Sequence, residues 1–160
     1  MGIIIGLYEP QIPQNTGNIA RTCAVTGSKL ILFGQAGFTL EEKKLRRAGL
    51  DYWNSVCMGN EESLENYLEN TAQPFYFFSS KAKRSFWEQP MEKNSLLIFG
   101  SETSGLPQHI TDKYEDRLVR IPMLEGQRCL NLSNSVSIAI YEVLRQNCGS
   151  KSSYSLNDAN

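Results

Sequence analysis

The sequence predicts one α/β domain, built on a mostly parallel sheet that is flanked by helices. Five strand-like runs recur along the 160 residues, and helical patterns lie between several of them. The run SLLIFG at 95–100 is apolar without alternation, as expected of a parallel strand that is covered on both faces. A chain of this length fits a single domain, which we expect to span residues 1–147.

Local patterns predict the elements in chain order. Strands are expected at 3–8, 29–34, 75–80, 95–100 and 117–122. The first helix should begin after residues 15–18, whose Asn and Thr side chains are favoured N-caps. A second helix should start at Thr39, which forms a capping box with Glu42, and should end at Gly49. A third helix is expected at 62–70.

The last predicted helix has an unusual start. Apolar residues recur at a period of 3.6 across residues 136–144, which predicts a packed helix. Its expected beginning is crowded with polar residues: Asn131, Ser133, Asn134 and Ser135. One helix N-cap needs fewer polar side chains than these four. The remaining stretch, 148–160, is rich in Ser and Asn, and we expect a flexible tail.

Composition excludes several classes of protein. No apolar run approaches the roughly 20 residues that span a bilayer, so we expect no membrane segment. The N-terminal MGIIIGLYEP lacks the basic flank and cleavage site of a signal peptide, so the expected location is cytoplasmic. The four cysteines are scattered and His109 is the single histidine, so we expect no metal site. The net charge of −1 argues against indiscriminate nucleic-acid binding, although it allows a local basic patch.

Three polar clusters each follow a predicted strand, at the edge of an open α/β sheet where ligands bind. The first, at 15–18, precedes a helix whose second turn carries Arg21, and it could hold an anionic group or be a capped helix with a surface arginine. The second places Glu102 between Gly100 and Gly105, either in a ligand-binding loop or in a tight turn with an exposed carboxylate. The third, at 128–135, could offer helix N–H donors to a ligand, or its own side chains could satisfy them.

Taken together, four segments carry a family resemblance. They are PQNTGNIARTCA, FTLEEKKLRRAGLDYW, FGSETSGLP, and RIPM followed by LNLSNSVSIAIYEVLRQ. Up to about Gln146, the chain resembles the SPOUT-class RNA methyltransferases. It is most similar to the minimal single-domain tRNA (cytidine/uridine-34) 2′-O-methyltransferases, which act on the wobble nucleotide of leucine tRNAs. The usual motifs of nucleotide hydrolysis, nicotinamide chemistry and zinc proteolysis are absent from the sequence.

The resemblance implies a C-terminal trefoil knot, S-adenosylmethionine bound in the knot loops, and a homodimer whose subunits complete each other's sites. It implies catalytic roles for Arg21, Asn15 and Glu102. Seven positions correspond to methyl-donor contacts: Phe78, Gly100, Ile121, Cys129, Leu130, Asn131 and Ser133. Relatives usually carry Ser where this chain has Cys129, which matters only if the hydroxyl itself is essential. The polar groups before the last helix would then line the cofactor and RNA pocket.

The implied reaction is direct transfer of a sulfonium methyl group to a ribose 2′-hydroxyl, without a covalent enzyme intermediate. Positioning the weak nucleophile could supply about 7 to 11 kcal/mol. Because a guanidinium keeps its proton near neutral pH, Arg21 would orient a phosphate and stabilise the developing alkoxide, and would not act as a base. Two alternatives remain open: methylation of ribosomal RNA, and a module that binds RNA or S-adenosylmethionine without turnover.

Two basic groups are candidates for tRNA contacts. The first lies on the second predicted helix and comprises Lys43, Lys44, Arg46 and Arg47. The second follows the third predicted strand and comprises Lys81, Lys83 and Arg84. Each group could bind phosphates, which would make affinity fall with salt, or form an ordinary solvated surface with acidic partners.

Overall fold

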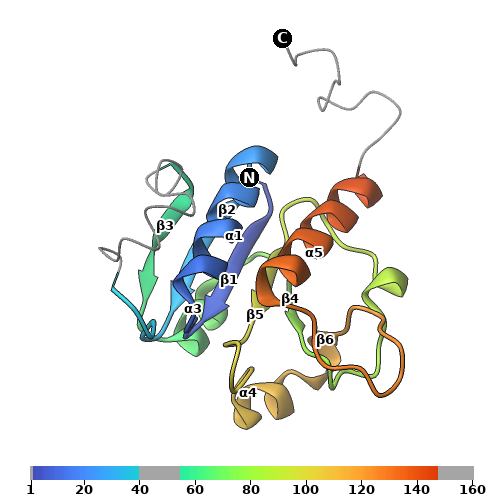
Figure 1. Ribbon diagram of the computed structural model, residues 1–160. Coiled ribbons are helices and arrows are strands. Elements are labelled where there is room, and N and C mark those ends of the chain that lie inside the picture. Colours follow the sequence, from blue (N-terminus) through green and yellow to red (C-terminus); the bar gives the residue numbers. More distant parts are fainter. Residues whose placement is uncertain (1, 40–54, 148–160) are drawn as a thin grey trace.

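The computed structural model describes residues 2–39 and 55–147 (Figure 1). Its strands are β1 (Ile4–Tyr8), β2 (Lys29–Phe33), β3 (Cys57–Glu61), β4 (Phe75–Phe78), β5 (Leu96–Phe99) and β6 (Leu118–Val119). Its helices are α1 (Pro13–Thr26), α3 (Leu64–Asn70), α4 (Gln108–Lys113) and α5 (Leu132–Asn147), with short 3-10 helices at Phe86–Glu88 and Glu115–Arg117. The helix expected from Thr39, with its four basic residues, and the tail 148–160 lie outside the described residues.

One six-stranded sheet forms the centre of the protein, in the order β3-β2-β1-β5-β4-β6. Every pairing in it is parallel, so the carboxyl ends of all strands point to the same edge. After β3 the chain crosses to the other side of β1, and β5 then inserts between β1 and β4. The predicted α/β class and its five strands are confirmed, although the strands end up to three residues earlier than expected.

The edge strand β3 was not predicted from the sequence. Its residues, CMGNE, include none of the β-branched or aromatic types that favour strands. The strand exists because it pairs with β2, and this pairing contains a register shift between Leu30 and Ile31. Pairing of this kind depends on tertiary structure, which local sequence patterns do not report.

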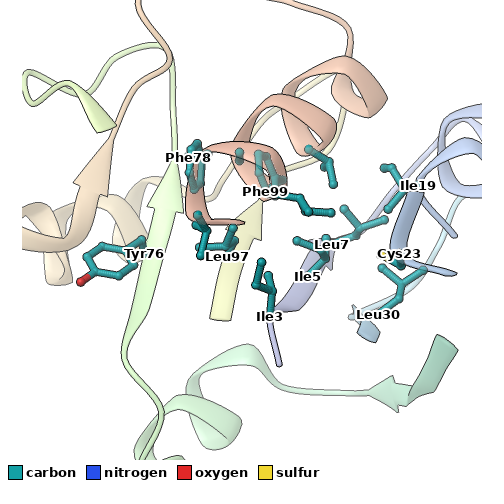
Figure 2. Close-up of a cluster of buried hydrophobic side chains, with 14 of the residues drawn as sticks. Ile3, Ile5, Leu7, Ile19, Cys23, Leu30, Tyr76, Phe78, Leu97 and Phe99 are labelled. Carbon is teal, nitrogen blue, oxygen red and sulfur yellow. The ribbon is translucent and has the colours of Figure 1, made fainter. Parts of the chain in front are cut away.

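Helices cover both faces of the sheet, and each face has its own core. On one face, Ile5 and Leu7 of β1 belong to one apolar cluster with Ile140 of α5 and with Ile19 of α1. Figure 2 shows Ile5, Leu7 and Ile19 in this cluster. On the other face, a second cluster joins neighbouring strand residues to α3 and α4, for example through Ile110. Figure 1 shows α1 and α5 side by side on their face of the sheet. Among the described residues, no helix has the length and apolar character needed to cross a membrane.

Both site-forming helices begin earlier than expected. Helix α1 starts at Pro13, so residues 15–18 lie inside its first turns and not before it. Proline suits the first helical position because the N–H that it lacks would have no partner there. The N-cap residue, Ile12, offers no side-chain cap. Helix α5 starts at Leu132, directly after Asn131, so the polar residues 133–135 lie inside its first turn and not before it.

Candidate active site

A cavity of about 790 Å³ opens at the carboxyl ends of β4, β5 and β6. Its walls are formed by the loops that follow these three strands, together with Ile12 and Asn15 from the start of α1. The parallel sheet brings the loops together, because each follows a strand that ends at the same edge. The volume is typical of a site for a small organic ligand.

Six of the seven residues predicted to contact a methyl donor line this cavity: Phe78, Gly100, Ile121, Cys129, Leu130 and Asn131. Phe78 is held by stacking on Phe99, with ring centroids 4.6 Å apart and ring planes 15° apart. The Leu130 side chain is 39% exposed and forms an apolar wall. The cavity therefore combines apolar surfaces with nearby backbone and side-chain polar groups, as ligand sites commonly do.

Gly100 is required by the backbone turn that follows β5. A Cβ atom at this position would collide with the backbone of Gly105 and Leu106. The turn is closed by two hydrogen bonds between Ser101 and Gly105, in which each N–H donates to the other residue's carbonyl oxygen, at 3.2 and 3.0 Å. Gly105 itself has a φ of +69°, which favours glycine. Glycine at position 100 thus permits this tight turn, whether or not a ligand also approaches it.

Glu102 extends from the turn to the start of α1. Its carboxylate accepts hydrogen bonds from the backbone N–H groups of Gln11, at 2.8 Å, and Ile12, at 3.3 Å. It also accepts a bond from the side-chain amide of Asn15, at 2.9 Å. A carboxylate is favourable at a helix N-terminus, where N–H groups lack partners within the helix. Glu102 therefore fixes the two residues that precede α1, together with the Asn15 side chain in its first turn.

Asn15 continues the chain of contacts to the third polar cluster. Its side-chain oxygen accepts a hydrogen bond from the amide of Asn131, at 3.0 Å. The Asn131 side-chain oxygen caps α5, accepting from the backbone N–H groups of Ser133, at 2.9 Å, and Asn134, at 3.4 Å. Glu102, Asn15 and Asn131 thus connect the β5 turn, α1 and α5 in one network.

Ser133 is placed behind the cavity and does not line it. Its hydroxyl donates a 2.7 Å hydrogen bond to the side-chain oxygen of Asn131, and the residue is buried. Ser135 does line the cavity, while its hydroxyl donates to the Asn131 carbonyl at 3.1 Å. Much of the polar surplus before α5 therefore serves the helix start itself.

The two cysteines whose side chains are described differ strongly in environment. Burial raises the pKa of the Cys23 thiol to about 12, so that side chain is an inert part of the core. The Cys129 side chain is exposed at the cavity, and its Sγ lies 3.2 Å from the hydroxyl oxygen of Ser80. Among the described residues, no group of three or more His, Cys, Asp or Glu side chains could hold a metal ion.

Arg21 lies apart from the residues described above. It is on the exposed side of α1 and does not line the cavity of its own chain. Lys81 lines the cavity, whereas Lys83 pairs with Glu115 at 3.2 Å. The Arg84 guanidinium donates to the side chain of Gln89 and to a backbone carbonyl.

Several cavity residues were missed by sequence reasoning. They are Ser80, Ser101, Ser104 and Met123, all in loops after the strands that converge here. Their position at or just beyond the end of a predicted strand is the signal that could have found them. The hydroxyls of Ser101 and Ser104 lie 2.7 Å apart, and the N–H of Ser104 also donates to the Ser101 hydroxyl.

Known proteins are similar to this chain in sequence and in fold. The profile of the SpoU rRNA Methylase family matches residues 2–141. A relative from Geobacillus stearothermophilus, provisionally named a tRNA (cytidine(34)-2′-O)-methyltransferase, is 45% identical over 150 residues that cover 91% of this chain and 96% of the relative. The tRNA (cytidine(34)-2′-O)-methyltransferase of Saccharophagus degradans is 42% identical over 146 residues, covering 89% and 94% of the two chains.

A solved structure, from work on the 2′-OH methylation of C/U34 on tRNA, superposes with a TM-score of 0.83. It is 38% identical and covers 90% of this chain and 95% of its own. Methyltransferases of the SpoU family use S-adenosylmethionine, and their SPOUT fold implies the expected trefoil knot. With a family profile that spans residues 2–141 and relatives aligned over nearly their full length, the chain belongs to the SpoU family of RNA methyltransferases.

Proposed function

We propose that this protein transfers a methyl group from S-adenosylmethionine to the ribose 2′-hydroxyl of the wobble nucleotide, C or U at position 34, of leucine tRNAs. One observation carries the proposal: the loops after β4, β5 and β6 line a single cavity, and six of the residues expected at a methyl donor lie in its walls. The relatives that cover nearly the whole chain support position 34 as the acceptor. Leucine tRNA as the substrate rests on the family resemblance alone.

The cavity fits the methyl donor in size and in lining. S-adenosylmethionine would supply an electrophilic methyl group on its sulfonium sulfur. Phe78, Ile121 and Leu130 offer apolar contacts, while the turn at Gly100 presents backbone groups. Such a mixture of apolar walls with a few fixed polar groups can bind and orient a nucleoside-bearing ligand.

Asn15 and Glu102 would support the reaction by positioning. The Glu102 carboxylate already accepts three hydrogen bonds from the start of α1, so its acceptor capacity is largely used. Asn15 connects Glu102 to Asn131, which caps α5 beside the cavity. These contacts would hold the donor loops and α1 in fixed relative positions, and such positioning can lower a reaction barrier substantially.

Arg21 is the proposed catalytic residue, and its position supports a homodimer. Because Arg21 is exposed on α1 and outside the cavity of its own chain, it would reach the cavity of a second subunit. There its guanidinium would hold a phosphate and stabilise the developing alkoxide. The outward faces of the two neighbouring helices carry exposed apolar residues: Val25 at 66%, Ile138 at 39% and Tyr141 at 55% exposure. Burial of these side chains against a second copy would favour association.

The test measures methyl transfer from labelled S-adenosylmethionine to leucine tRNA transcripts. The expected result is one ribose methyl group at position 34, and none on a matched transcript with a 2′-deoxynucleotide at that position. Methylation of the deoxy transcript, or of ribosomal RNA in preference to tRNA, would contradict the proposal. Cofactor binding measured by calorimetry without any transfer would instead indicate a binding module. Sedimentation of the protein should show a dimer, and a monomer that retains full activity would exclude the shared site.

A further inference from the structure

A second hollow, of about 850 Å³, adjoins the methyl-donor cavity. The two share Ser80, Ile121, Met123 and Cys129, so they lie on either side of a common wall. The remaining lining comes from the loop between β6 and α5, and it carries two arginines, Arg120 and Arg128, against one carboxylate. This hollow therefore adjoins the donor site, and its lining has a positive balance of charge.

The charges of the two arginines are not neutralised by an acidic side chain within the part of the chain that the structure describes. Both residues are exposed, and among the described residues neither side chain forms an ion pair. The backbone of Arg120 is fixed on both sides, because its N–H donates to the Arg84 carbonyl at 2.9 Å and its carbonyl accepts from Phe86 at 3.0 Å. In contrast, Lys83 and Arg84 already bind groups of the protein. Exposed arginines without an ion-pair partner are suited to bind phosphate, and in Arg120 the backbone that carries the side chain is also fixed.

An exposed tryptophan lies two residues from the segment that pairs with Arg120. Ser85 forms an isolated parallel bridge with Arg120, and Trp87 follows two residues later in the 3-10 helix Phe86–Glu88. Phe86 is fully buried and anchors this short helix, and the Ser85 hydroxyl accepts the Trp87 N–H at 3.2 Å. The Trp87 side chain is nevertheless 62% exposed. An exposed indole on a backbone segment that pairs with Arg120 suits stacking of an unpaired nucleic-acid base.

We propose that Trp87, Arg120 and Arg128 form the docking surface for the single-stranded anticodon loop of the substrate RNA. Arg120 and Arg128 bind phosphates next to the acceptor nucleotide, and Trp87 stacks on an unpaired base. This inference rests on the proposed function, and it extends that function by assigning residues to recognition of the loop. Single-stranded RNA fits because it offers both regularly spaced phosphates and exposed base faces, whereas an acidic protein segment would offer charge without planar bases.

The test measures binding of an anticodon stem-loop RNA to the full chain at several salt concentrations. For the double variant Arg120→Ala, Arg128→Ala, the slope of log affinity against log salt should become shallower by about 1.4, since each phosphate contact in single-stranded RNA contributes about 0.7. For Trp87→Ala, affinity should fall about fivefold or more with an unchanged slope, and Trp87→Phe should recover part of the loss. Lys93→Ala, which removes an exposed cation just before β5 at the opposite edge of the sheet, should match the wild type in both measurements.

The possible results distinguish failure of the proposed docking surface from failure of the proposed methyl transfer. A wild-type salt slope in the double arginine variant, or wild-type affinity in Trp87→Ala, overturns the docking surface. If the wild type methylates position 34 while these variants bind normally, the reaction stands and the surface is wrong. If the variants weaken binding as expected but the wild type transfers no methyl group, the surface stands and the proposed reaction is wrong. Absence of any stem-loop binding by the wild type overturns the surface.

Discussion

Replacing Glu102 with glutamine tests whether this carboxylate positions the start of α1. In the wild type its two oxygens accept hydrogen bonds from the N–H of Gln11 at 2.8 Å, the N–H of Ile12 at 3.3 Å and the amide of Asn15 at 2.9 Å. Glutamine keeps the size of the side chain but has a single acceptor oxygen. Its NH₂ group must therefore face either Gln11 or the pair Ile12 and Asn15, and all three of these groups are donors.

The expected loss follows from the charge and from the number of acceptors removed. A hydrogen bond to a charged group contributes about 1.5 to 3 kcal/mol, and a carboxylate at a helix N-terminus adds about 0.3 to 1 kcal/mol. The bonds to Gln11 and Asn15 are only partly buried and the bond to Ile12 is exposed, so water can replace part of what is lost. We therefore expect the free energy of unfolding of Glu102→Gln to fall by about 1 to 2 kcal/mol.

Urea denaturation followed by circular dichroism measures this change. Glu102→Gln should unfold at a lower urea concentration with an unchanged slope, whereas Glu92→Gln, at an exposed carboxylate before β5, should match the wild type. Methyl transfer by Glu102→Gln should fall, while its pH dependence keeps the wild-type shape. Equal midpoints in the two variants would refute the capping argument. Loss of one limb of the pH profile would instead identify Glu102 as a general base.

Four further changes have defined outcomes. Arg21→Ala should abolish methyl transfer and leave cofactor affinity within a few fold, since the proposed contacts of its guanidinium are to the RNA and not to the methyl donor; retained turnover would contradict its role. Cys129→Ser should preserve or raise activity in the same labelled-donor assay, because a hydroxyl can keep the contact to the neighbouring serine, and a large loss would show that the thiol is needed. Gly100→Ala should lower the free energy of unfolding by about 1 to 3 kcal/mol, because its Cβ collides with the backbone across the turn; an unchanged urea midpoint would refute this. The pKa of Glu65 is lowered from 4.5, first by a backbone hydrogen bond and then by His109. The ionised Glu65 side chain therefore stabilises the fold fully above its ordinary pKa, and this contribution disappears as the pH falls through the lowered pKa. Glu65→Gln removes this contribution, so the variant should lose less stability on acidification than the wild type. Thermal unfolding measured at several pH values tests this, and equal losses in the two proteins would contradict it.

Local sequence patterns predicted the strands and helices whose apolar residues follow the pattern of their buried faces. The run at 95–100 lacks alternation because β5 is covered by helices on both faces, and the apolar period at 136–144 marks the buried side of α5. Strand β3 was missed because its formation depends on pairing with β2. The early start of α1 was missed for a related reason, since the carboxylate that binds the N–H groups just before the helix belongs to Glu102, 91 residues away from Gln11 in sequence.

The polar clusters show why sequence alone left two interpretations of each. Asn131 caps α5, accepts and donates within the network, and still lines the cavity, so the structural and the ligand-binding interpretations hold for the same side chain. The cap fixes the orientation of Asn131, and Asn15 and Glu102 then fix the distance between α5 and the β5 turn. Because these hydrogen bonds are all formed within the protein, the polar side chains of the cavity wall are held in position without a ligand. In the sequence, a side chain that caps a helix and also lines the site looks the same as a side chain that only caps the helix. The two roles can be distinguished only in the structure, where the ends of three strands converge on the cavity.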